Sequence, residues 1–139
     1  MRAAVFLAMI IFGGLVSSAW ALDAEQWFIE GNRFSAEGRF EEAVRAYQKS
    51  IDQNPLAPVA HYNLGIAYKN IRQLDKATKV LDKAVELAPT NLDIRLTLGN
   101  IYNRKERWAD AIGQLNICLL YTSDAADEGL GVDLGGRRI

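Results

Sequence analysis

The sequence is poor in the residues that build disulfides, metal sites and cofactor sites. It holds one Cys and one His among 139 residues, so neither a disulfide framework nor a Cys/His zinc site can form within one chain. Its 16 Lys+Arg residues are balanced by 17 Asp+Glu residues, which argues against a strongly basic nucleic-acid binder. Glycine loops of the phosphate-binding type are absent as well. We therefore expect no cofactor, no metal and no small-molecule substrate.

Charge is missing from one long run, at the N-terminus. Arg2 is followed by fourteen uncharged residues, 3–16, and the segment ends at Ala19-Trp20-Ala21. This layout is typical of a secretory signal over residues 1–21, cleaved after Ala21. The alternative is an uncleaved membrane anchor, although a membrane span needs roughly 18–20 apolar residues. In both cases we expect an exported protein, periplasmic or secreted, which touches a membrane only if the signal is retained.

A 34-residue repeat occupies the middle of the chain. Its clearest column is Gly31, Gly65 and Gly99. The same interval relates an aromatic column, a second column of aromatics or leucine, an alanine column and a proline column: Phe34, Tyr68 and Tyr102; Phe40, Leu74 and Trp108; Ala43, Ala77 and Ala111; Pro55 and Pro89. A period of this size indicates a solenoid. Apolar residues at three- and four-residue spacing predict two helices in each unit.

The glycine column predicts close packing. Glycine within a helix costs about 1 kcal/mol relative to alanine, so three glycines in phase indicate a place where two helices approach closely. We expect the alanine column of the second helix to form the complementary small surface. The aromatic residues at 34, 68 and 102 are expected to fill the space between helices.

These columns resemble those of the tetratricopeptide repeat family. The repeats are 24–57, 58–91 and an incomplete 92–117, with the family's Leu-Gly pair at Leu64-Gly65 and Leu98-Gly99. The resemblance implies an all-α fold, a right-handed α-solenoid of about two and a half repeats that is truncated at the C-terminus. We expect the helix pairs 24–37 with 41–53, 58–71 with 75–87, and 92–105 with 109–117 or slightly beyond.

The last segment, residues 118–139, does not continue the repeat. The proline column falls on Ser123, and the run Cys118–Ser123 resembles the translated transposon end of sequencing-library adapters. The stretches 124–128 and 131–139 fit the same adapter. We therefore interpret 118–139 as adapter-derived and exclude it from the native repeats. A helical extension over Cys118–Ser123 is still expected, because Leu119 and Leu120 can cover the exposed last helix.

Catalytic groups are hard to find. The single histidine, His61, stands in a packing column, and a general base needs a partner within reach. Asp75 and Lys79 are four residues apart and predict a surface ion pair on a helix. Lys76, Lys79 and Lys83 alternate with acidic residues, so we interpret them as a solvated face. The protein is not expected to be an enzyme.

The family resemblance implies that a protein or peptide binds in the concave groove lined by the first helices. Groove places of the family that hold apolar or amide residues here are the candidate partner-binding residues: Phe28, Asn32, Tyr62, Asn63, Ile66, Leu96, Asn100 and Asn103. The subfamily that grips a terminal carboxylate needs Lys or Arg where this chain has Phe28, Asp93 and Thr97, so no such clamp is expected.

Two functions remain open. The first is an exported interaction module that serves as a scaffold or assembly factor. The alternative is an accessory repeat region of a longer envelope enzyme or assembly machine whose C-terminal part is missing. Neither reading involves nucleic acid.

Overall fold

The computed structural model describes residues 23–130, which are helical or form turns, with no strand in this part of the chain. A helix over 23–36 comes first. It is followed by α2 (Phe40–Gln53), α3 (Pro58–Asn70), α4 (Leu74–Leu87), α5 (Leu92–Arg104) and α6 (Trp108–Leu130). These bounds confirm the predicted helices to within one residue, except that α6 is longer. The predicted signal, 1–21, and the end of the tail lie outside the described residues.

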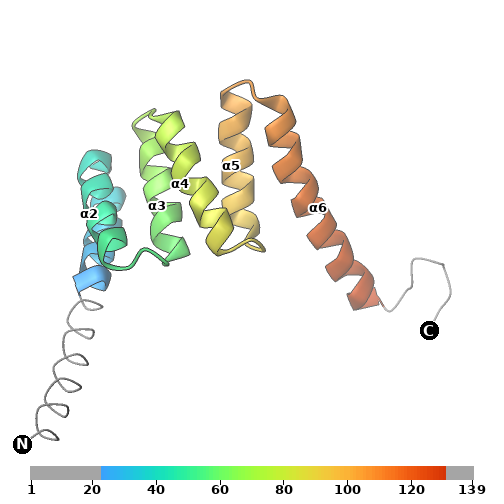
Figure 1. Ribbon diagram of the computed structural model, residues 1–139, viewed down its shortest axis with the longest axis horizontal. Helices are drawn as coiled ribbons and strands as arrows, with labels where there is room; N and C mark the ends of the chain where they lie inside the picture. Colours follow the sequence, from blue (N-terminus) through green and yellow to red (C-terminus); the bar gives the residue numbers. More distant parts are fainter. Residues whose placement is uncertain (1–22, 131–139) are drawn as a thin grey trace, which may run out of the picture.

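The helices stand in a row and pack mainly on their neighbours in the chain: α2 on α3, α3 on α4, α4 on α5 and α5 on α6. Figure 1 shows this succession, which is the α-solenoid expected from the repeat. One continuous apolar core runs along the row, from Ala43 and Tyr47 in α2 to Tyr102 in α5 and Ala111 in α6.

The glycine column is a close-packing site in the first two repeats. A Cβ atom added at Gly31 would lie 2.5 Å from the Tyr47 ring, and one added at Gly65 would lie 2.5 Å from Cγ of Leu81. The atoms nearest to these two glycines therefore belong to bulky residues, whereas at Gly99 the backbone oxygen of Ala111, a member of the alanine column, would be 3.7 Å from the added atom. At Gly99 the nearest atom, Cβ of Gln114, would be 3.6 Å away, so close packing was wrongly predicted there.

The aromatic column connects consecutive repeats. Tyr68 in α3 is buried, and its hydroxyl accepts a hydrogen bond from Gln48 in α2 at 3.0 Å. The hydroxyl of Tyr102 in α5 donates to Asp82 in α4 at 3.2 Å. Both tyrosines thus reach from the first helix of one repeat to the second helix of the repeat before it.

The turn inside each repeat needs a left-handed backbone. Gly38, Arg72 and Glu106 stand 34 residues apart with φ of 74°, 62° and 57°. Glycine adopts this conformation freely, whereas a residue with a Cβ atom is strained in it. Two of the three turns therefore carry a non-glycine residue in a backbone conformation that favours glycine.

Helix α6 extends past the repeat, and it continues beyond the N-terminal end of α5, against which it runs antiparallel (Figure 1). The expected helix over Cys118–Ser123 is present. Leu119 and Leu120 are 65% and 64% exposed, however, so the expectation that they cover the last helix is wrong. None of the helices within residues 23–130 combines the length and the apolar character that crossing a membrane requires.

Candidate functional site

The first candidate site is a hollow between the first helices of repeats one and two. Its volume is about 310 Å³. Three of the predicted residues line it, namely Asn32 on the helix over 23–36 and Asn63 and Ile66 on α3, together with Ser35, Ala36 and Tyr47. The repeat register places the two asparagines 31 residues apart on adjacent first helices, so their side chains meet.

A hydrogen-bond network orders the amides of this hollow. The Oδ1 atom of Asn32 accepts from the Tyr47 hydroxyl at 2.8 Å and from Nδ2 of Asn63 at 2.9 Å. Burial raises the pKa of Tyr47, so its hydroxyl stays protonated and able to donate at neutral pH. Within the described residues, no hydrogen bond occupies Nδ2 of Asn32 or Oδ1 of Asn63. One donor and one acceptor are therefore held ready at fixed positions.

The remaining candidate residues lie around this hollow or farther along the row. The Phe28 ring packs against the ring of Tyr47, with 6.0 Å between centroids, and is partly buried against the core. Tyr62 on α3 is also partly buried, and its hydroxyl is 3.4 Å from that of Thr97 on α5.

The last three candidates are on α5. Leu96 is 49% exposed, and Asn100 and Asn103 are exposed too. They do not line the hollow with Asn32 and Asn63. The structure thus brings together three of the eight candidates, places Phe28 against the lining residue Tyr47 and the Tyr62 hydroxyl near α5, and leaves the α5 candidates exposed.

Tyr47 is a lining residue that the sequence reasoning missed. Tyr47 and Leu81 stand 34 residues apart in one column of the repeat, and Tyr47 is 1% exposed, as a packing residue is. The available signal was its hydroxyl: it is the member of that column with a polar atom, and this atom reaches Asn32.

His61 and Arg95 share a structural role. The Nε2 atom of His61 is 2.9 Å from the Pro55 carbonyl oxygen, and Nε of Arg95 donates to the Pro89 carbonyl at 2.7 Å. Each therefore holds the loop that precedes its own helix. Among residues 23–124 no group of three or more His, Cys, Asp and Glu side chains is placed to hold a metal ion.

Two repeat families match the chain. The family described as TPR repeat matches residues 31–71, and the tetratricopeptide repeat family matches residues 58–91. A TPR repeat-containing protein of Methanocaldococcus jannaschii is 23% identical over 104 residues, which is 75% of this chain and 17% of that protein. The Hsp70-Hsp90 organizing protein 2 of Arabidopsis thaliana is 35% identical over 63 residues, 45% of this chain and 11% of that protein. The chain thus spans less than a fifth of these relatives.

Solved structures share the fold. The crystal structure of MamA has a TM-score of 0.73 at 23% identity, covering 77% of this chain and 63% of that one. The second TPR of Spaghetti (RPAP3), bound to the HSP90 peptide SRMEEVD, has a TM-score of 0.69 at 22% identity and covers 72% of this chain and 93% of that one.

Proposed function

Since residues 31–91 belong to the tetratricopeptide repeat family, we propose that this protein is a non-enzymatic interaction module. It binds an extended peptide segment of a protein partner in the groove formed by its first helices. The single observation that carries this proposal is the Asn32–Asn63 pair, fixed by Tyr47 beside a hollow of about 310 Å³.

The chemistry of this pair suits a peptide backbone. Nδ2 of Asn32 can donate to a peptide carbonyl, while Oδ1 of Asn63 can accept from a peptide N–H. Because the Tyr47 hydroxyl and the Asn63 amide already hold Asn32, little side-chain entropy is lost when the peptide binds. Ile66 and the partly buried Phe28 and Tyr62 add apolar surface for one or two side-chain anchors. This mode gives affinity through the backbone and specificity through the anchors.

The proposals on localisation and biological role rest on the sequence. We propose an exported protein, periplasmic or secreted, that acts as a scaffold or assembly factor without nucleic acid or small-molecule substrates. The alternative is an accessory region of a longer envelope enzyme or assembly machine; the relatives of which the chain spans 17% and 11% are longer proteins, as this alternative requires.

The proposed function can be tested with peptides selected from a displayed random library on the full chain. Affinities of the selected peptides are then measured for the wild type and for the double variant Asn63→Ala with Ile66→Ala. Each hydrogen bond or apolar contact contributes about 1 kcal/mol, so losing one of each should weaken binding by the double variant roughly thirtyfold. Tyr47 keeps its bond to Asn32 in this variant, which protects the fold.

The matched control is Lys79→Ala, an exposed change on α4 outside the hollow. It should leave the affinity unchanged, and circular dichroism should show the same helix content for all three proteins. If folded Asn63→Ala/Ile66→Ala retains the wild-type affinity for every selected peptide, this groove is not the binding surface.

A further inference from the structure

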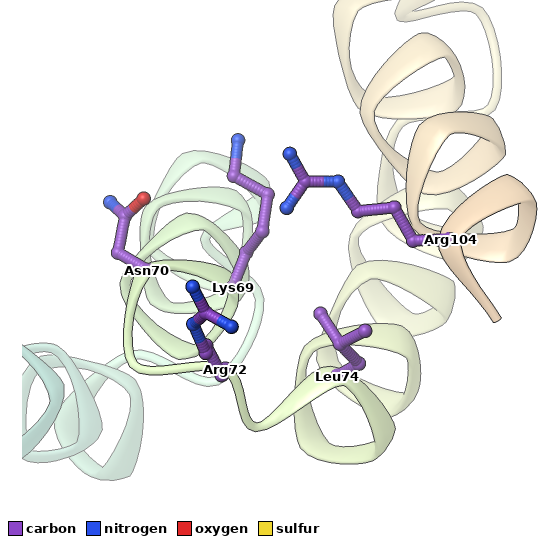
Figure 2. Close-up of a pocket in the computed structure, with 5 residues that line it drawn as sticks. All are labelled: Lys69, Asn70, Arg72, Leu74 and Arg104. Carbon is purple, nitrogen blue, oxygen red and sulfur yellow. The ribbon is translucent and has the colours of Figure 1, made fainter.

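A second hollow, of about 520 Å³, lies where α3 ends and faces α5. Three cations line it, Lys69 and Arg72 in repeat two and Arg104 in repeat three, together with Asn70 and Leu74. Figure 2 shows the Arg104 side chain extending from α5 toward Lys69 on α3, with Arg72 at the turn that follows α3. Among the residues that the structure describes, no acidic side chain lines this hollow.

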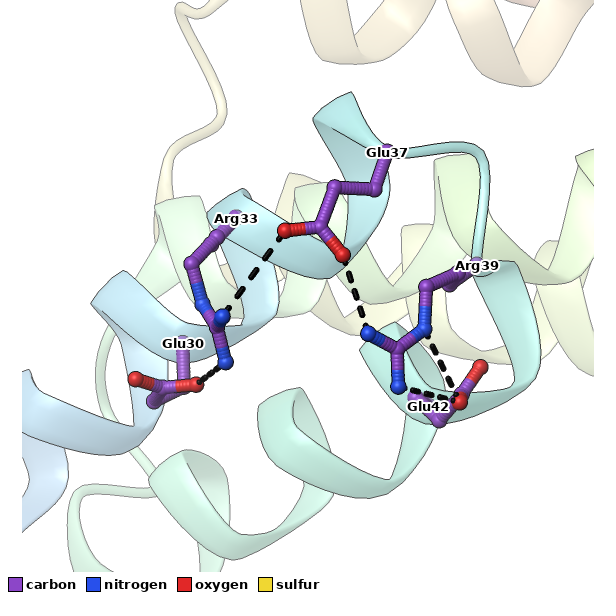
Figure 3. Close-up of polar contacts among 5 residues, drawn as sticks. All are labelled: Glu30, Arg33, Glu37, Arg39 and Glu42. Atoms are coloured by element: carbon purple, nitrogen blue, oxygen red, sulfur yellow. Dashed lines mark hydrogen bonds and ion pairs between the residues drawn. The ribbon is translucent and has the colours of Figure 1, made fainter.

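Five cations elsewhere in the described part of the chain have acidic partners. Arg33 bonds Glu30 at 2.6 Å, and Arg39 bonds Glu37 at 3.0 Å and Glu42 at 2.7 Å, as Figure 3 shows. Similar ion pairs hold Lys83, Lys105 and Arg107.

Within the described residues, by contrast, Lys69, Arg72 and Arg104 form no ion pair. Asp75, three residues after Arg72, is bound by Lys105, and this hydrogen bond lowers the pKa of Asp75. The predicted pair of Asp75 with Lys79 is therefore wrong. Because Asp75 is engaged across the repeats, it does not neutralise the three cations.

Arg72 also departs from the pattern of the other turns. In repeats one and three an arginine just before the second helix covers the aromatic ring of its own repeat: Arg39 lies 4.5 Å from the centroid of Phe34, and Arg107 lies 4.8 Å from that of Tyr102. Each also pairs with an acid three residues later. Repeat two has Gln73 at that place, and its arginine stands one residue earlier, with φ of 62°. Within the described residues, Arg72 therefore has neither the contact with an aromatic ring nor the ion pair that Arg39 and Arg107 form.

We propose that Lys69, Arg72 and Arg104 bind side-chain carboxylates of an acidic peptide segment. Charge complementarity carries the assignment, because three cations with no acidic partner converge on one open hollow. Guanidinium groups bind carboxylates through two parallel hydrogen bonds, and Asn70 adds an amide. The hollow shares no residue with the three clamp places described above, Phe28, Asp93 and Thr97.

This inference rests on the proposed peptide-binding function. It adds that the peptide carries acidic residues next to its apolar anchor. Ile66 in the first hollow and Lys69 in the second are three residues apart on α3, and residues at this spacing are neighbours on a helix surface. A peptide anchored at Ile66 therefore places its next residues beside the cations. A partner of this kind has an apolar residue followed by Asp or Glu.

The probe for the cations alone is a fluorescein-labelled tetraglutamate peptide, capped at both ends so that it has no terminal carboxylate. Fluorescence anisotropy measures its binding to the full chain at about 20 mM and about 200 mM salt, since added salt screens exposed charges. We expect Arg72→Gly and Arg104→Gln each to weaken binding about three- to fivefold and the double variant roughly tenfold or more. A capped tetraglutamine peptide should not bind.

Two control variants separate charge and backbone effects. Lys79→Gln removes an exposed cation outside the hollow, and Glu106→Gly relaxes the same turn conformation as Arg72→Gly without removing a cation. Neither should weaken binding. Because Arg72→Gly places glycine where φ is positive, its fold is preserved.

The groove variant Asn63→Ala/Ile66→Ala should still bind tetraglutamate, so the proposed function and this inference can fail separately. The inference is overturned if the Arg72→Gly/Arg104→Gln double variant binds tetraglutamate as the wild type does, or if Lys79→Gln weakens binding equally. It is also overturned if inorganic phosphate displaces the peptide at equal charge concentration, or if a single-stranded oligonucleotide of the same charge binds more tightly.

Discussion

At Gly65 the space left by a missing side chain is filled by Leu81, which is fully buried. A methyl group there would lie 2.5 Å from Cγ of Leu81, an atom that cannot move without shifting the core. The glycine at position 99 has the same place in the repeat, but its nearest neighbours are 3.6 Å away. The same residue type thus has different packing in consecutive repeats.

We therefore predict opposite effects of the same substitution. Gly65→Ala should lower the free energy of unfolding by about 1–3 kcal/mol, because overpacking strains a close contact. Gly99→Ala should raise it by up to about 1 kcal/mol, because alanine favours helix and has room. Chemical denaturation followed by circular dichroism measures both. Equal shifts of the two unfolding midpoints in the same direction would contradict the packing seen at Leu81.

The left-handed turn residues give a second prediction at this scale. Glu106 has φ of 57° and is exposed, so Glu106→Gly removes strain without removing a packed side chain. We expect the free energy of unfolding to rise by about 0.5–1 kcal/mol. Gly38→Ala, which places a Cβ atom at φ of 74°, is the reciprocal control and should be destabilising. A lower unfolding midpoint for Glu106→Gly would show that the turn is not strained.

At the scale of the element, α6 differs from the other helices. Its first part packs on α5: Ala111 is buried, and Oε1 of Gln114 accepts from Arg95 at 3.0 Å. Its later part leaves Leu119 and Leu120 open to solvent. The repeat does not continue into this part, because the proline column falls on Ser123.

We expect the double variant Leu119→Ser with Leu120→Ser to change the free energy of unfolding by no more than about 0.5 kcal/mol. The matched control is Leu98→Ser, since Leu98 in α5 is fully buried, and it should be severely destabilising. Thermal unfolding of the full chain compares the two. A loss of several degrees in the Leu119→Ser/Leu120→Ser variant would mean that these leucines are covered in solution.

At the scale of the whole molecule, the 34-residue period predicted the row of helices well. Up to α5 the helix bounds agreed within one residue, because they depend on local features such as the apolar spacing in Leu74–Leu87 and the prolines that follow Asn54 and Ala88. The stacking of repeats follows from the same period, because each helix pair buries its apolar face only against the next pair.

The candidate site was predicted in part. Asn32, Asn63 and Ile66 share a hollow as a groove requires, while the roles of all eight candidate residues as partner contacts stay predictions. The hydrogen bond from Tyr47 to Asn32 was not predicted. Tyr47 has a place in the repeat that is typical of a buried packing residue, and its polar atom lies at the far end of the buried ring.

By itself the sequence determined the repeat, its helices and the columns that face the core, since these depend on spacing along one helix or one turn. The tertiary structure decided which side chain each glycine meets, how Asn32, Asn63 and Tyr47 join, and that Lys69, Arg72 and Arg104 converge on one hollow. Such contacts join residues up to 35 positions apart. They depend on how far consecutive repeats are displaced from one another and on where long side chains extend, which the spacing within a single repeat does not encode.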